Sequence, residues 1–114
     1  MRKFIIDTDI GADADDVVAL GYLLKKGNSG LCEVSAVTIC SAREKAENCV
    51  YSVLNEYDKS DIPVGKYDGT PLGCDKNDNY AADMATAGVK TRNAVKLMRK
   101  VLAENDKTDI ICIG

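Results

Sequence analysis

The sequence has no histidine and no tryptophan, and its five cysteines stand singly, without a C-x-x-C pair. Without histidine, no cysteine can form the thiolate–imidazole pair that activates cysteine nucleophiles. Because an odd number of cysteines cannot all pair within one chain, we interpret them as reduced thiols that pack as small hydrophobic groups. The absences therefore argue against thiol catalysis.

Excess charge of one sign and long apolar runs are also missing. The chain has 15 basic and 18 acidic residues and a net charge of -3, so it lacks a basic field that could attract nucleic acid or anionic lipid. Only the short apolar run 4–6 separates Met-Arg-Lys from Asp7, which is too little for a signal peptide or a membrane span. We therefore expect a cytoplasmic protein with neither nucleic-acid nor membrane partners.

Hydrophobic patterning predicts alternating strands and helices in one domain, consistent with 114 residues and 46% apolar content. Ser41 and Glu44 form a capping box, which predicts a helix start at Ser41, and Thr91 is expected to cap the last helix. Residues 66–90 show no sustained period and predict a long loop. The expected order is strand 3–8, helix 13–26, strand 33–40, helix from 41, strand 61–65, helix 91–104 and strand 109–113. This order predicts an α/β fold with a mostly parallel, Rossmann-like sheet and flanking helices.

An acidic stretch stands between the first strand and the first helix. Like charges this close repel, so the folded stretch must bind a cation, take up protons or spread its side chains into solvent. Helix capping would use only one or two of these residues. The stretch also lies at the carboxyl end of a parallel strand, where ligands of such sheets bind. Its aspartates therefore predict a cation or catalytic site; they are Asp7, Asp9, Asp13, Asp15 and Asp16.

Two known chemistries fit this stretch less well. An EF-hand loop that starts at Asp7 would need glycine as its sixth residue and glutamate as its twelfth, where the chain has Ala12 and Val18. The run from Phe4 to Asp9 resembles the first motif of haloacid-dehalogenase-like phosphatases, in which Asp7 would be the nucleophile and Asp9 the acid/base beside magnesium. Gly11 and the acidic pair at 15–16 depart from that motif. This phosphatase chemistry and a non-catalytic α/β module are the alternatives.

The stretch 7–20, D-T-D-I-G-A-D-A-D-D-V-V-A-L, resembles the N-terminal signature of the inosine-uridine preferring nucleoside hydrolase family. Further segments resemble successive landmarks of that family: residues 36–38, Asn48, residues 61–65 and residues 109–114. Together they cover nearly all of this sequence but only the N-terminal part of a family member. The resemblance implies a nucleoside hydrolase-like domain that cleaves the N-glycosidic bond of ribonucleosides with calcium as cofactor.

The resemblance also implies roles for single residues. Asp9 and Asp16 would bind calcium, and Asp9 would also orient or deprotonate the attacking water, which makes it the catalytic candidate. Asp15 would bind a ribose hydroxyl. Asp7 and Asp13 would support these residues from the surrounding shell, although Asp13 lies in a spacing variant of the motif and could take the place of Asp15.

The chain departs from the family pattern in two places. After Thr38 the family commonly has glycine and asparagine, whereas this chain continues with Ile39-Cys-Ser-Ala42, which predicts a different contact with the substrate. The family also takes further calcium ligands, and often a histidine that activates the base, from regions beyond Gly114. We therefore expect residues 1–114 to be the N-terminal portion of one domain, to bind calcium weakly alone, and to belong to a homo-oligomer in the full-length form.

Overall fold

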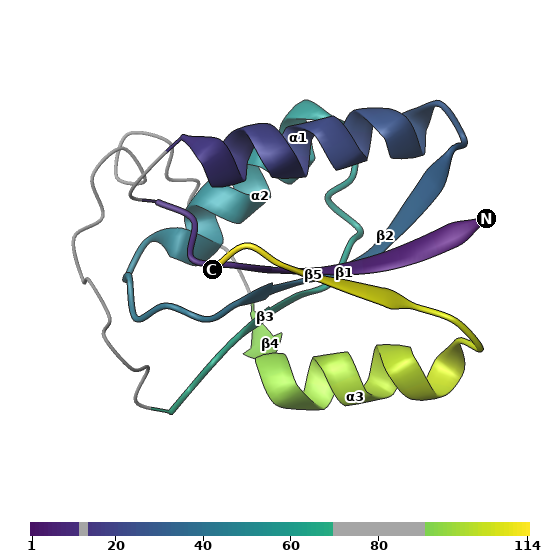
Figure 1. Cartoon of the computed structure of the whole chain (residues 1–114). Coiled ribbons are helices and arrows are strands. Elements are labelled where there is room, and N and C mark those ends of the chain that lie inside the picture. The colour runs from purple at the N-terminus through teal and green to yellow at the C-terminus, as the bar shows by residue number, and fades with distance from the viewer. Residues whose placement is uncertain (12–13, 70–90) are drawn as a thin grey trace.

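The structure is a computed structural model that describes residues 1–11, 14–69 and 91–114 (Figure 1). No helix among these residues has the length and apolar character needed to cross a membrane. Strands and helices alternate along most of the chain. The elements are β1 (Arg2–Thr8), α1 (Asp15–Asn28), β2 (Cys32–Ile39), α2 (Ala46–Glu56), β3 (Val64–Lys66), β4 (Arg92–Asn93), α3 (Ala94–Glu104) and β5 (Asp109–Cys112).

The strands form one sheet in the order β4-β3-β2-β1-β5, and every neighbouring pair is parallel. The α/β fold with a parallel sheet, predicted from the alternation of strands and helices, is confirmed. The chain moves outward from β1 to β4 and then returns to place β5 on the other side of β1. Strand order therefore reverses between β1 and β5, and ligands of open α/β sheets bind beside such a reversal.

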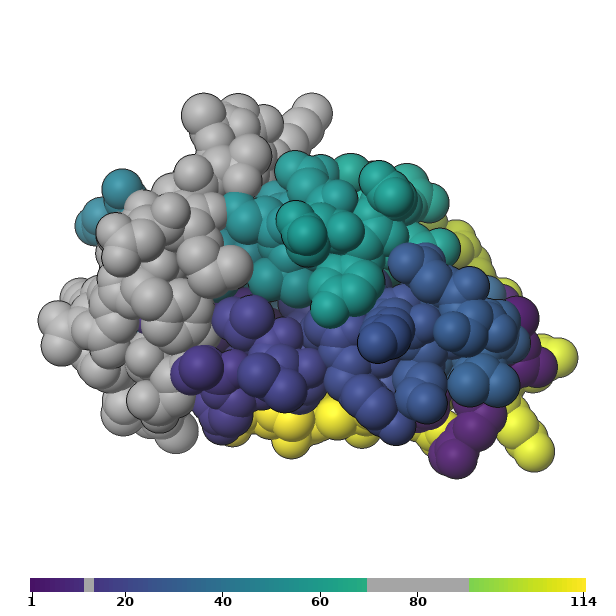
Figure 2. All heavy atoms as spheres, turned by 90° about the horizontal axis from the view of Figure 1, so that it is seen from above, coloured from purple at the N-terminus to yellow at the C-terminus, as the bar shows by residue number. Residues whose placement is uncertain are grey.

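Helices cover both faces of the sheet, with α1 and α2 on one face and α3 on the other (Figure 1). Because successive side chains of a strand point to opposite faces, Ile6 and Val37 join the core beneath α1 and α2, whereas Ile5 and Ala36 join the core against α3. These four side chains are fully buried. Figure 2 shows α1 and α2 side by side over their face of the sheet. This burial on both faces explains why apolar residues stand next to each other in the middle of β1 and β2.

Two helix starts differ from the predictions. The capping-box prediction for Ser41 is wrong, because α2 begins at Ala46 behind Lys45, which makes no side-chain cap. The segment 41–45 instead leads from β2 past the end of β1. In α3 the cap is Asn93 rather than Thr91: its side chain accepts a 3.0 Å hydrogen bond from the Lys96 amide. The predicted long loop at 66–90 lies outside the described residues from position 70 onward.

Close packing at Gly65 provides a test of the fold. A Cβ added there would lie 2.7 Å from the Ala94 Cα, which is backbone and cannot move aside easily. We expect Gly65→Ala to lower the free energy of unfolding by about 1–3 kcal/mol, the usual cost of overpacking. Gly27→Ala is the matched control, since its nearest contact would be an ordinary 3.5 Å to the Cys32 carbonyl oxygen. Equal urea midpoints for the two variants would contradict this packing.

Candidate functional site

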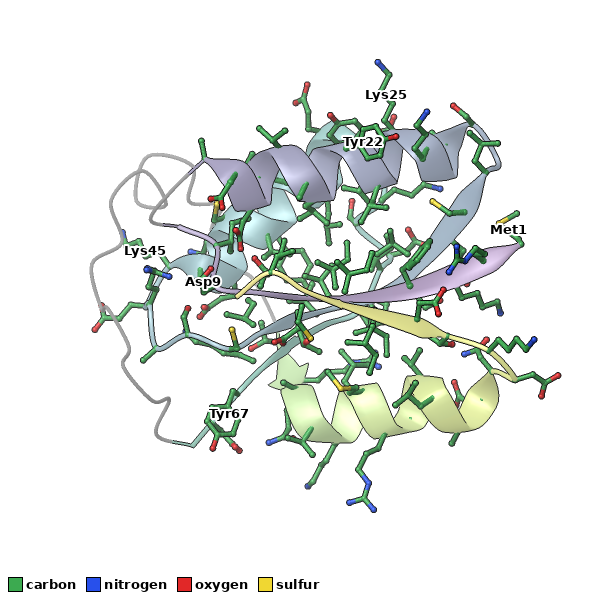
Figure 3. The ribbon with its side chains drawn as sticks, viewed as in Figure 1. Met1, Asp9, Tyr22, Lys25, Lys45 and Tyr67 are labelled. Atoms are coloured by element: carbon green, nitrogen blue, oxygen red, sulfur yellow. The ribbon has the colours of Figure 1, made fainter. Side chains whose placement is uncertain are left out.

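The acidic loop, defined here as residues 7–16, begins with the last two residues of β1 and ends in the first turn of α1. It lies at the carboxyl end of β1, beside the reversal of strand order. In Figure 3, Asp9 is at the end of β1 that is remote from Met1. The side chain of Asp9 is 45% exposed, Asp15 is exposed and Asp16 is buried. Asp13 lies outside the described residues.

A threonine hydroxyl connects the two ends of the acidic loop. Thr8 Oγ1 accepts a 3.1 Å hydrogen bond from the Ile10 amide and donates one to Asp16 Oδ2. Both Thr8 and Asp16 are almost fully buried. Between them the backbone turns through Gly11, whose φ of 124° suits glycine and few other residues. The hydroxyl therefore holds Asp16 against the end of β1.

The environment of Asp16 is unfavourable for its charge. Burial raises the pKa of this carboxyl group above its ordinary value, and the hydrogen bond from Thr8 opposes that rise. The negative charges of Asp9 and Asp15 raise the pKa further, and Asp9 also acts through a side-chain hydrogen bond. The structure thus brings Asp9 and Asp16 together, with Asp15 close enough for its charge to raise the pKa of Asp16. That they bind a cation stays a prediction.

Asp7 is held from the neighbouring strands rather than from α1. Thr38 lies directly opposite it on β2, and its buried hydroxyl donates a 2.6 Å hydrogen bond to Asp7 Oδ1. The amide of Ile113 donates a 2.9 Å hydrogen bond to the Asp7 carbonyl oxygen. These contacts orient Asp7 within the sheet, which is compatible with the predicted supporting role.

Arg43 is a site residue that the sequence patterns did not reveal. Its side chain is only 5% exposed, yet its guanidinium donates a hydrogen bond to the Asp9 carbonyl oxygen. Nη1 also lies 3.8 Å from Asp9 Oδ2, within the range of an ion pair. The predicted capping box placed Arg43 in the first turn of a helix and so hid this contact. The sequence did contain a signal for this contact: Arg43 is a basic residue four positions after β2, and β2 pairs with β1, the strand that ends in the aspartates.

Cys40 also lies beside the acidic loop. Its amide and its thiol both donate to the Thr8 carbonyl oxygen, at 3.0 Å and 3.4 Å. Burial, followed by the negative charges of Asp7 and Asp9, raises the pKa of this thiol to about 11. Cys40 is therefore a protonated thiol at neutral pH, in agreement with the argument against thiol catalysis. The described cysteines are all free: Cys32, Cys40, Cys49 and Cys112.

The donor set agrees with calcium only in part. Two neighbouring carboxylates, Asp9 and Asp16, suit a hard cation, and their mutual repulsion would be relieved by one. Calcium takes roughly six to eight oxygen ligands. In the parts of the chain that the structure describes, no group of three or more acidic, histidine or cysteine side chains is gathered to hold a metal ion. Asp9 and Asp16 alone are too few for such a shell, and calcium binding by them stays a prediction.

Comparison with known proteins supports the fold. The sequence matches no protein-family model, and it matches no curated protein. Among solved structures, it is similar to a plant nucleoside hydrolase, with a TM-score of 0.67 and 24% sequence identity. The similarity covers 99% of this chain and 39% of that enzyme. The chain therefore has a nucleoside hydrolase-like fold and spans well under half the length of the enzyme it resembles.

The raised pKa of Asp16 predicts that this residue opposes folding. Its folded-state pKa lies above the ordinary 3.8, so the free-energy cost of its buried charge is absent well below 3.8. The cost grows as pH rises from 3.8 to the folded-state pKa and is then constant. We expect Asp16→Asn, in the presence of chelator, to stabilise the protein at neutral pH by about 1 kcal/mol. Thermal unfolding at neutral pH and below pH 3.8 measures this, with Asp106→Asn, at an exposed position between α3 and β5, as control. A gain that persists unchanged in acid would contradict the assignment.

The protonated state of Cys40 predicts slow alkylation. At neutral pH we expect iodoacetamide to modify Cys40 on the order of tenfold more slowly than the exposed Cys112, because only the thiolate reacts. Peptide mapping by mass spectrometry gives both rates in one sample. Unfolding in urea should bring the two rates together. Equal rates in the folded protein would show that the pKa of Cys40 is not raised.

Proposed function

We propose that this chain acts as part of a nucleoside hydrolase, which cleaves the N-glycosidic bond of ribonucleosides with calcium. The observation that carries the proposal is the placement of Asp16 beside Asp9, where Thr8 holds it against the carboxyl end of β1. The nucleoside hydrolase-like fold supports it. So does the reversal of strand order beside this position, because ligands of parallel sheets bind there. A preference for inosine and uridine is part of the same proposal.

In this proposal Asp9 and Asp16 hold the cation, and Asp9 also positions a water molecule. The 45% exposure of the Asp9 side chain leaves it free to face substrate and solvent, whereas the buried Asp16 is oriented by Thr8. When bound, calcium would supply a positive charge that makes a water molecule easier to deprotonate. Asp9 would accept that proton, since its carboxylate lies next to the cation site.

The remaining aspartates would act on the sugar or support the loop. Asp15 is exposed at the start of α1, where its carboxylate can accept a hydrogen bond from a ribose hydroxyl. Carboxylates near the sugar also stabilise the positive charge that develops as the glycosidic bond breaks. Asp7, oriented by Thr38, would support Asp9 from within the sheet. A supporting role for Asp13 stays a prediction.

Two carboxylates leave most of a calcium shell to other groups. The chain spans 39% of the plant enzyme that it resembles. We therefore propose that residues 1–114 form the N-terminal portion of a larger domain, which supplies further ligands. Assembly of that full-length form into a homo-oligomer and its location in the cytoplasm stay predictions.

Calcium titration of single variants tests the ligand assignment. We expect amide chemical shifts of the acidic loop to move with calcium, and both Asp9→Ala and Asp16→Ala to weaken binding roughly tenfold or more, as loss of a ligand contact does. Asp106→Ala is the control: it removes an exposed carboxylate from the connection between α3 and β5, at the amino ends of the parallel strands. Unchanged affinity in both site variants would refute the assignment.

Sugar release tests the reaction itself. With inosine or uridine as substrate, we expect slow formation of reducing sugar that requires calcium, stops with chelator and is absent in Asp9→Ala. The rate should be low, because the described residues supply two carboxylates for a shell of roughly six to eight oxygen ligands. Failure of concentrated protein to release ribose, together with beryllium fluoride labelling of Asp7 in the presence of magnesium, would favour the phosphatase alternative.

A further inference from the structure

Asp9 already has a cationic neighbour within the chain. The Arg43 guanidinium donates a hydrogen bond to the backbone carbonyl of Asp9 and lies 3.8 Å from its carboxylate. The two partners differ in exposure, since the Arg43 side chain is 5% exposed and that of Asp9 is 45% exposed. The carboxylate can thus turn toward a second cation, whereas the guanidinium is enclosed by protein.

Arg43 is itself held in place by its surroundings. Its carbonyl oxygen accepts a 2.7 Å hydrogen bond from Lys66 Nζ, and the same ammonium group donates a 2.8 Å hydrogen bond to Glu47 Oε2. Lys66 belongs to β3 and Glu47 to α2, so two separate elements anchor the segment that carries Arg43. Lys66 and Glu47 form an ion pair with each other, so among the described residues the cation within ion-pair distance of Asp9 is Arg43.

We infer that Arg43 is a fixed counter-cation of the acidic loop. In this role Arg43 positions Asp9 and lowers the affinity of the loop for divalent cations. This inference rests on the proposed cation role of Asp9 and Asp16. A buried guanidinium keeps its charge at any accessible pH. Its attraction for the Asp9 carboxylate competes directly with that of a metal ion, and the two positive charges also repel each other. The loop would therefore bind calcium more weakly than its carboxylates alone allow.

Removal of the charge provides the test. In calcium titrations of the full 114-residue chain, followed by amide chemical shifts, we expect Arg43→Gln to bind calcium roughly three- to tenfold more tightly than the wild type, the scale of one partly screened charge interaction. Arg43→Lys keeps the charge and should stay within about twofold of the wild type. Arg99→Gln removes the same charge from the exposed face of α3, on the other side of the sheet, and should change nothing.

A neutral isostere covers the case in which Arg43→Gln does not fold. Citrulline keeps the shape of arginine and N–H donors for the Asp9 carbonyl oxygen but carries no charge. Cys40 and Cys49 flank Arg43, so the chain can be assembled by native chemical ligation with citrulline at position 43. The citrulline protein should show the same gain in calcium affinity. Far-UV circular dichroism of each variant verifies the fold.

The outcomes separate this inference from the proposed function. Tighter calcium binding without the Arg43 charge supports the inference, even if binding to the wild type is too weak to detect. Calcium binding that is equal or weaker in Arg43→Gln and in the citrulline protein overturns the inference and leaves the proposed calcium role intact. No calcium binding by any variant overturns both.

Discussion

Repulsion among carboxylates at the end of β1 is the constraint on which the rest of the site depends. The chain places these groups together because Thr8 bonds to Asp16 and so pulls the start of α1 against the strand. Burial then makes the charge of Asp16 costly, and Asp9 and Asp15 add to that cost. A fold that needed only a tight connection between a strand and a helix would gain stability from a neutral residue at this position. The retained charge is typical of a site that trades stability for function.

The structure answers the repulsion in two ways. The raised pKa of Asp16 favours uptake of a proton, and the buried guanidinium of Arg43 provides a permanent positive charge next to Asp9. Neither response involves Asp15, which remains exposed at the helix start. The proposed calcium ion would therefore enter a site that is already partly compensated. The same position beside the reversal of strand order would give a nucleoside access to these groups.

Much of the fold could be predicted because its signals are local. The apolar run before Asp7 and the helical spacing after it predicted β1 and α1, and the alternation of elements predicted a parallel sheet. The start of α2 was mispredicted for a physical reason. Ser41 and Glu44 have the spacing of a capping box, but the segment that contains them carries Arg43 to Asp9 instead. A local pattern cannot show that a contact with a distant segment is stronger.

The sequence by itself determined the class of fold, the position of the acidic loop at a strand end and the identity of the carboxylates that crowd there. These follow from periodicity and from residues that are adjacent in the chain. Only the tertiary structure decided that Asp16 turns inward to Thr8, that Asp7 bonds to Thr38 across the sheet, and that Arg43 reaches Asp9. The last two contacts join segments far apart in sequence, and the first depends on how the helix packs, so their partners are set by strand pairing and packing rather than by spacing along the chain.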